Sequence, residues 1–360
     1  MGASPERSGS RRWVVGTAAV LAGLGVRAVL RERREQGEGQ PGERPRRISW
    51  VGRKLDPYPT LEDQGLVLPV LPPAEIVTVP GRGEMFVRRT SGTSGTSGAS
   101  EGGEGVPVLL LHGWMASADL NWFLLFHELS RHHPVIAPDL RGHGRGIRSH
   151  RPFSLEDCAD DAAALLRHLG VERALVVGYS MGGPVAMLVW QRHPELVAGL
   201  VLEATALEFS GSPRERLVWH LTGPLGLLLR WPTGRIVLLR LTGGIEEVPT
   251  SLLRFRAWAD GEFRRNDPTE VAEAGRALGR FDARPFAGSI DVPTAVVVTT
   301  KDSLVAPDKQ RALARAVRAQ VFEFAGDHAA VALQAGEFAR VTLDAIATIS
   351  PRTAGLPATP

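Results

Sequence analysis

The sequence predicts an α/β fold in which a mostly parallel central sheet is covered by helices on both faces. Beyond about residue 73, short apolar or β-branched runs alternate with longer helical patterns. Three of the short runs, at residues 108–111, 174–177 and 294–298, are apolar at nearly every position. Such alternation is typical of a parallel sheet, whose central strands are buried on both faces and therefore lose the polar alternation of an exposed strand.

Local signals place the other elements along the chain. Two β-branched and apolar runs at 76–79 and 85–87 predict an opening hairpin. The other helices are expected at residues 121–129, 154–169, 184–191 and 312–319, and the other strands at 135–137, 199–203 and 321–324. Ser154 is expected to cap its helix, with Asp157 at the third position, because a serine oxygen can accept a backbone N–H that the first helical turn leaves unpaired.

The pentapeptide Gly178-Tyr179-Ser180-Met181-Gly182 separates a predicted strand from a predicted helix. A Gly-x-Ser-x-Gly sequence in that setting predicts a serine on a sharp strand-to-helix turn. Glycine is expected two residues before and two after the serine, because a Cβ at either place would collide with the reversing backbone. The Ser180 oxygen would then project from the sheet edge near the N–H groups that open the helix. Ser180 is therefore the candidate nucleophile.

A serine hydroxyl attacks only when a base takes its proton, and an acid must orient that base. Asp302 lies in the loop that leaves the predicted strand at 294–298, and His328 follows the short strand at 321–324. Nucleophile, acid and histidine thus occur in the order expected for this turn, each at the carboxyl end of a strand. Two rival acids are weaker: Glu203 also ends a strand, whereas Asp327 is better explained as a capping residue.

The negative charge of a tetrahedral intermediate requires fixed hydrogen-bond donors. One donor is expected to be the backbone N–H of Met181, directly after the nucleophile. The second is expected from the loop after the strand at 107–111, where His112-Gly113-Trp114 permits a tight turn and the Trp114 N–H would face the site. His112 is interpreted as a brace of this loop rather than as a catalytic group.

With these motifs, the chain resembles the α/β-hydrolase superfamily, over about residues 73–349. The resemblance is greatest to the bacterial serine esterase and lipase branch, which also contains lactonases, C–C bond hydrolases and cofactor-free perhydrolases. Serine at position 180 separates the chain from the dehalogenase and epoxide hydrolase branches, which have aspartate there. The residues that carry the resemblance are His112-Gly113-Trp114, Asp139-Leu140-Arg141-Gly142-His143-Gly144, residues 178–183, Asp302 and His328.

The resemblance implies a hydrolase domain at 73–350 with a helical cap inserted at 206–290. The cap sequence is rich in apolar and aromatic residues, including Trp219 and Trp258, which favours an apolar acyl or alkyl group in the substrate. We therefore expect a small carboxylic ester to be cleaved through an acyl-enzyme. Lactone, C–C or perhydrolase chemistry on the same residues is the alternative, and a ligand-binding receptor with little turnover is the alternative of another class.

The N-terminal arm carries the basic excess of the chain. Of the 42 basic and 39 acidic residues, twelve and five lie in residues 1–54, which leaves 30 and 34 for the rest. The apolar run at 13–30 is followed by arginines, which predicts an uncleaved anchor at the inner membrane face with the enzyme in the cytoplasm. A polybasic helix on an anionic membrane, a twin-arginine export signal and a disordered arm are the alternatives. A nucleic-acid partner is not expected.

The remaining composition adds few constraints. Cys158 is the single cysteine, so no internal disulfide can form and no oxidising compartment is required. The sequence contains no metal-ligand cluster or phosphate-binding loop, and no cofactor is expected. The repetitive stretch at 90–105 predicts a flexible connector, and the tail at 351–360 is expected to be loose. The sequence makes no prediction of oligomeric state.

Overall fold

The computed structural model describes residues 71–90, 103, 105–213, 215–217, 219, 258–259 and 261–350. The predicted basic arm at 1–54, with its apolar segment at 13–30, lies outside these residues, as do the tail at 351–360 and most of the connector. Much of the predicted cap at 206–290 also lies outside them. Within the described ranges, no helix is both long enough and apolar enough to cross a membrane.

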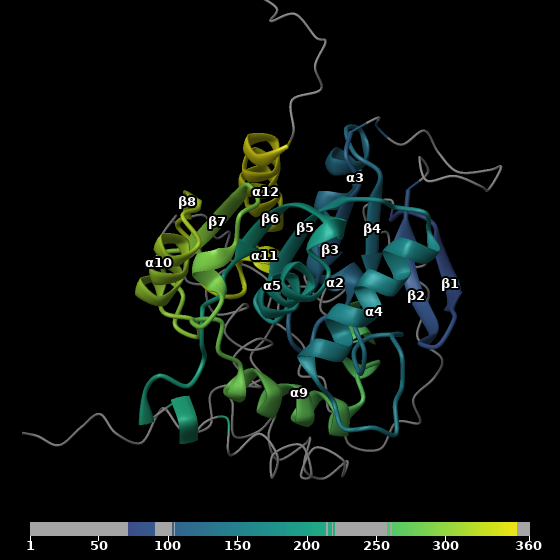
Figure 1. Ribbon diagram of the computed structural model, residues 1–360, viewed down its shortest axis with the longest axis horizontal. Helices are drawn as coiled ribbons and strands as arrows, with labels where there is room; N and C mark the ends of the chain where they lie inside the picture. Colours follow the sequence, from purple (N-terminus) through teal and green to yellow (C-terminus); the bar gives the residue numbers. More distant parts are fainter. Residues whose placement is uncertain are drawn as a thin grey trace, which may run out of the picture.

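The centre of the protein is an eight-stranded sheet with the strand order β1-β2-β4-β3-β5-β6-β7-β8 (Figure 1). Strands β3 to β8 pair in parallel, whereas β1 and β2 form an antiparallel hairpin that joins the sheet through β4. The mostly parallel sheet and the opening hairpin are therefore confirmed. The strands are β1 Ala74–Val79, β2 Gly83–Arg89, β3 Val108–Leu111, β4 Val135–Pro138, β5 Ala174–Tyr179, β6 Val197–Glu203, β7 Thr294–Thr299 and β8 Gln320–Phe324.

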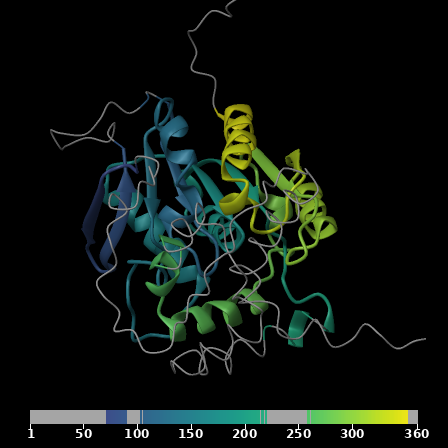
Figure 2. The same cartoon turned by 180° about the vertical axis from the view of Figure 1, so that it is seen from behind.

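Helices cover both faces of the sheet, as predicted. One face packs on α4, α5 and α10, and the other on α2, α3, α11 and α12; the reverse view in Figure 2 brings α12 to the front. Helix α9 lies beyond one end of the strands in both views. The helices are α2 Ala118–Trp122, α3 Leu125–Ser130, α4 Leu155–His168, α5 Gly182–Arg192, α9 Pro268–Arg280, α10 Pro307–Ala316, α11 Ala330–Leu333 and α12 Ala335–Ile349.

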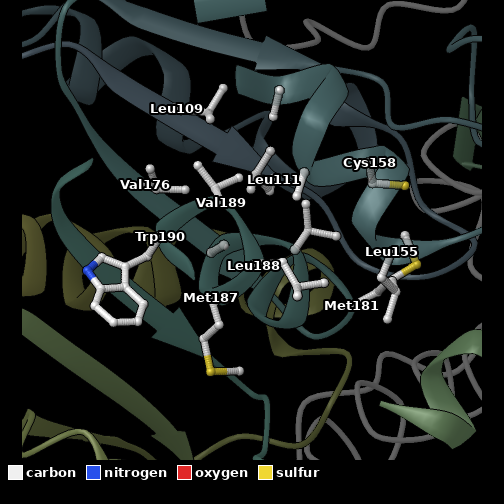
Figure 3. Packing of buried hydrophobic residues seen from close by; sticks show 14 of the residues in the cluster. Leu109, Leu111, Leu155, Cys158, Val176, Met181, Met187, Leu188, Val189 and Trp190 are labelled. Atoms are coloured by element: carbon white, nitrogen blue, oxygen red, sulfur yellow. The ribbon is translucent and has the colours of Figure 1, made fainter. Parts of the chain in front are cut away.

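The two cores follow from the two-residue repeat of a strand. Leu109 and Leu111 of β3 face α4 and α5, whereas Val108 and Leu110 face the opposite helices, and all four side chains are buried. Figure 3 shows the first of these cores, with Val189 of α5 beside the sheet residues. Burying each such side chain contributes about 1.5–3 kcal/mol. The sheet is thus a rigid platform for the loops at its carboxyl edge.

Some element boundaries differ from the sequence prediction. The single helix expected at 121–129 is two helices, α2 and α3, which are separated at Phe123 and Leu124. Helix α10 begins at Pro307, ahead of the predicted start at 312, because proline is favoured in the first turn of a helix. Ser154 does cap α4 as predicted, since its hydroxyl accepts the backbone N–H of Asp157.

Candidate active site

Ser180 lies on a sharp turn between β5 and α5. Its backbone has a φ of 50°, a left-handed conformation that non-glycine residues rarely adopt. Its N–H donates to the carbonyl oxygen of Glu203 on the neighbouring strand, at 2.9 Å, which supports this strained geometry. A Cβ on Gly178 would collide with the carbonyl of Gly182, and a Cβ on Gly182 would collide with that of Leu111. The two glycines of the pentapeptide are thus required by close backbone approach, as the sequence predicted.

The side chains of Ser180, His328 and Asp302 form one hydrogen-bonded chain. His328 Nδ1 lies 2.7 Å from Asp302 Oδ2, and His328 Nε2 lies 2.9 Å from Ser180 Oγ. Because a carboxylate only accepts, Nδ1 carries the proton and leaves the Nε2 lone pair free to accept the serine hydroxyl. Ser180 is 9% exposed and the His328 side chain 10%, so a reactant must enter a largely covered site.

Asp302 is held as an anion by its donors. Its Oδ1 accepts the backbone N–H groups of Leu304 and Val305 at 2.8 and 2.9 Å. Its Oδ2 accepts the Thr299 hydroxyl at 2.8 Å as well as the histidine N–H. Burial alone would raise the pKa of Asp302, but the charge of His328 and these hydrogen bonds together lower that pKa below its usual value. The carboxylate can therefore orient His328 and stabilise its protonated form.

Glu203, the first rival acid, lies elsewhere. Its carboxyl group is fully buried, and its Oε1 lies 2.7 Å from the hydroxyl of Thr342 on α12 rather than near His328. Burial raises the pKa of Glu203 to about 8, against the opposing effect of the Thr342 hydrogen bond. The second rival, Asp327, caps a turn as expected, because its Oδ1 accepts the N–H of Ala329 at 2.8 Å.

The two predicted oxyanion donors lie in different segments: Trp114 is in the loop after β3, and Met181 is in the turn after β5. Within the described part of the chain, the backbone N–H groups of Trp114 and Met181 donate to no protein acceptor. Gly113 lies against the nucleophile, since a Cβ there would lie 3.4 Å from the Cβ of Ser180. The side chain of Asn121 fixes this glycine by accepting its N–H at 2.9 Å. Sequence reasoning did not identify Asn121, which lies in the helical pattern after the loop.

His112 braces the same loop, as the sequence predicted. Its Nε2 accepts the N–H of Leu140 at 2.9 Å, so Nδ1 carries the proton and donates to the carbonyl of Gly113 at 2.8 Å. Burial lowers the pKa of His112 to about 4, which keeps the ring neutral. Asp139 ties the next loop to α2, because its Oδ1 accepts the N–H of Ala118 at 2.7 Å. The loop at 139–144 therefore has a structural role.

Comparison with known proteins identifies the family. Residues 106–331 match the sequence model of the alpha/beta hydrolase fold. The chain belongs to this family. A pimeloyl-[acyl-carrier protein] methyl ester esterase from Neisseria meningitidis is 30% identical over 210 residues, which are 56% of this chain and 77% of that protein. The crystal structure of an enol-lactonase from Burkholderia xenovorans has a TM-score of 0.62 and 25% identity, over 76% of this chain and all of that one.

Other relatives of this α/β hydrolase match over shorter stretches. The acetyltransferase component of an acetoin cleaving system from Pseudomonas putida is 40% identical over 103 residues, which are 28% of this chain and 27% of that protein. The chain spans only 27–37% of the length of several such curated relatives.

In this α/β hydrolase, residues 262–271, which include the first turn of α9, are hydrogen-bonded to the loop at 112–117 that carries the predicted donor Trp114 (the oxyanion loop). The Trp114 indole N–H donates to the carbonyl of Val271 at 2.8 Å, and the Asn266 amide donates to the carbonyl of Met115 at 2.8 Å. Glu262 accepts the Ser117 hydroxyl at 2.7 Å. These partners are up to 157 residues apart in the sequence. Part of the predicted cap thus fixes the loop that presents the Trp114 N–H.

Aromatic side chains from the same insertion meet the oxyanion loop. The ring centroids of Trp114 and Trp219 lie 5.7 Å apart, and Phe209 and Trp219 are 6.3 Å apart at nearly right angles. Trp258, another tryptophan of the predicted cap, packs on Phe123 instead. The apolar character expected of the cap is therefore present beside Trp114 in the described residues.

Proposed function

We propose that this protein is a serine hydrolase that cleaves a carboxylic ester through an acyl-enzyme. The observation that carries the proposal is the hydrogen-bonded chain from Ser180 Oγ through His328 to Asp302, with distances of 2.9 and 2.7 Å. A base at hydrogen-bond distance from a hydroxyl, itself oriented by an anion, is the arrangement that activates serine. The methyl ester esterase relative supports the ester as the bond attacked.

The reaction follows from the positions of these groups. His328 Nε2 takes the proton of Ser180 as its oxygen attacks the ester carbonyl carbon, and the N–H groups of Trp114 and Met181 bind the resulting oxyanion. Collapse of this intermediate breaks the ester bond, and the leaving alcohol receives the proton from His328. Water then gives a proton to His328 as its oxygen attacks the acyl carbon. The bond between that carbon and Ser180 Oγ breaks, Oγ takes the proton back from His328, and the carboxylic acid leaves.

The substrate class rests on the residues around the oxyanion loop. The contact between Trp114 and Trp219 places apolar surface next to the proposed oxyanion donor. Apolar walls with a few fixed polar groups favour a small molecule with an apolar acyl or alkyl group. A lactone is the second candidate, because an enol-lactonase is among the similar solved structures and a lactone is a cyclic ester.

A panel of p-nitrophenyl esters with rising acyl chain length tests both parts of this proposal. We expect turnover by the wild type, a preference for chains longer than acetyl, and loss of turnover in Ser180→Ala. Ser130→Ala, at the end of α3, is the matched control and should retain full turnover. Activity on acetate alone would contradict the apolar acyl group. Tight ligand binding without any turnover would favour the receptor alternative.

A further inference from the structure

Tyr179 connects the nucleophile to the base. It is the last residue of β5 and directly precedes Ser180. Its hydroxyl donates to the backbone carbonyl of His328 at 2.6 Å, across 149 residues of sequence. The residue is 3% exposed, so this hydrogen bond is shielded from water. One residue therefore fixes Ser180 through the backbone and contacts the His328 turn through its side chain.

The ring of Tyr179 is held by aromatic packing. Phe338 and Trp122 meet it edge to face, with centroids 5.7 and 6.4 Å away. The His328 ring lies 5.7 Å from it on another side. Edge-to-face contacts of this kind are favourable and leave a buried ring little freedom to turn. The packed ring thus holds the hydroxyl in a fixed position next to the His328 carbonyl.

Backbone hydrogen bonds hold both ends of the turn that carries His328: the Gly326 carbonyl accepts the N–H of Lys301 at 2.9 Å, and the Asp327 carbonyl accepts the N–H of Ala330 at 3.2 Å. The turn links the end of β8 to α11, a helix of only four residues, and Asp327 caps it locally through Ala329. The imidazole itself bonds to Asp302 and Ser180, the two groups with which it must align. The Tyr179 hydroxyl contacts the backbone of His328 itself, from which the ring projects, whereas the other backbone contacts lie at its neighbours.

We propose that Tyr179 is a positioning residue: it holds the His328 backbone where the ring Nε2 lies within hydrogen-bond distance of Ser180 Oγ. This inference rests on the proposed function, because alignment of the base matters only if the base acts. The residue does not touch the reacting atoms, and its effect is exerted through the carbonyl of His328. The two free positions of the Gly-x-Ser-x-Gly sequence thus have different tasks: Tyr179 aligns the base, and Met181 supplies an oxyanion donor.

The Tyr179 hydroxyl remains a donor over the working pH range. Burial raises the pKa of Tyr179 well above its ordinary value, and the nearby carboxyl groups of Asp302, Glu203 and Asp327 raise it further. A proton is therefore always present for the bond to His328.

The direct test is Tyr179→Phe, which removes one oxygen atom and keeps the ring. We expect kcat for a p-nitrophenyl ester to fall about ten- to a hundredfold with KM within about twofold, because small misplacements of reacting groups reduce rate strongly. The melting temperature should fall by only about 2–4 °C. Wild-type kcat in Tyr179→Phe would overturn the proposal.

Phe338→Leu is the matched control for packing. It removes a ring that supports Tyr179 but leaves the hydroxyl and its acceptor in place. We expect a larger loss of melting temperature than in Tyr179→Phe, with kcat within about threefold of wild type. An equal loss of kcat in both variants would show that Tyr179 is merely structural and would overturn the proposal.

A readout without turnover separates this inference from the proposed function. Backbone hydrogen exchange at residues 327–331, measured in the Ser180→Ala background, should be faster with Tyr179→Phe than without it, because the carbonyl of His328 loses its partner. Unchanged exchange would overturn the positioning role. A different result would be faster exchange with Tyr179→Phe while the wild-type protein hydrolyses no ester. That result would refute the proposed function and still support the contact between Tyr179 and the His328 turn.

Discussion

Two buried carboxyl groups at the ends of neighbouring strands have pKa values that are shifted in opposite directions. Asp302 follows β7 and accepts hydrogen bonds from backbone N–H groups, a hydroxyl and His328, which together lower its pKa. Glu203 ends β6, and its Oε2 has no hydrogen-bond partner among the described residues. Burial is then the dominant effect and raises the pKa of Glu203 to about 8. The charge of His328 and the hydrogen-bond donors around Asp302 outweigh the effect of burial there, whereas at Glu203 the single Thr342 hydrogen bond does not.

The surroundings of Glu203 also accommodate its proton. The Thr342 hydroxyl lies 2.7 Å from Glu203 Oε1 and 3.2 Å from the carbonyl of Phe338. A hydroxyl has one proton and cannot donate to both acceptors fully. A protonated Glu203 donates to Thr342, which then donates to Phe338, so both bonds are made. Glu203 is therefore a structural group beside Ser180 that is protonated below about pH 8, and Asp302 is the anion that orients the proposed base, His328.

The largest expected effect comes from replacing each carboxyl group with its isosteric amide. Asp302→Asn should lower kcat by roughly 10³–10⁴-fold, because an amide cannot fix the productive tautomer of the histidine. At pH 7, Glu203→Gln should leave kcat within about threefold, because a pKa of about 8 keeps most of the native group protonated there. Steady-state kinetics on one p-nitrophenyl ester compares the two. A larger loss in Glu203→Gln than in Asp302→Asn would reverse the assignment.

The next effect is on stability as a function of pH. The pKa of Glu203 is raised from 4.5 to about 8 in the folded state, so the unfolded state loses the proton first as pH rises. Its contribution to stability is complete below about pH 4.5 and is lost progressively up to about pH 8. Glu203→Gln should flatten this decline, which is on the order of a few kcal/mol. Urea unfolding at several pH values measures it, and parallel curves for the variant and wild type would contradict a neutral Glu203.

The smallest effect distinguishes the two threonines that contact these carboxyl groups. Thr299→Val removes a donor to Asp302 and should lower kcat about three- to tenfold, whereas Thr342→Val should leave kcat unchanged. Both variants should lose about 1 kcal/mol of unfolding free energy, since each loses one buried hydrogen bond. Denaturation and kinetics on the pair give the comparison. Equal kcat in both variants would remove the functional difference between the two sites.

The residues predicted from sequence are those whose placement follows from a local pattern. Ser180 is specified by its flanking glycines, and Asp302 and His328 lie directly after strands, whose carboxyl ends meet at one sheet edge. Contacts between distant segments could not be predicted in this way. No spacing links Trp114 to Val271, and no pattern assigns the Tyr179 hydroxyl to a carbonyl 149 residues away.

The helix boundaries show the same limit. The break between α2 and α3 at Phe123 and Leu124 lies in a continuous helical pattern with no proline or glycine to mark it. Helix α9 was not predicted, although Asp267 and Pro268 are a clear start signal and the Asp267 carboxylate accepts the N–H groups of Thr269 and Glu270. Tertiary packing determines these details.

The most direct measurement of the central claim is the mass of the protein after rapid mixing with a p-nitrophenyl ester and acid quenching, followed by peptide mapping. Formation of an acyl-enzyme predicts a mass increase equal to the acyl group, located on the peptide that contains Ser180 and absent in Ser180→Ala. Acylation at another residue, or ester turnover that persists in Ser180→Ala, would contradict the account.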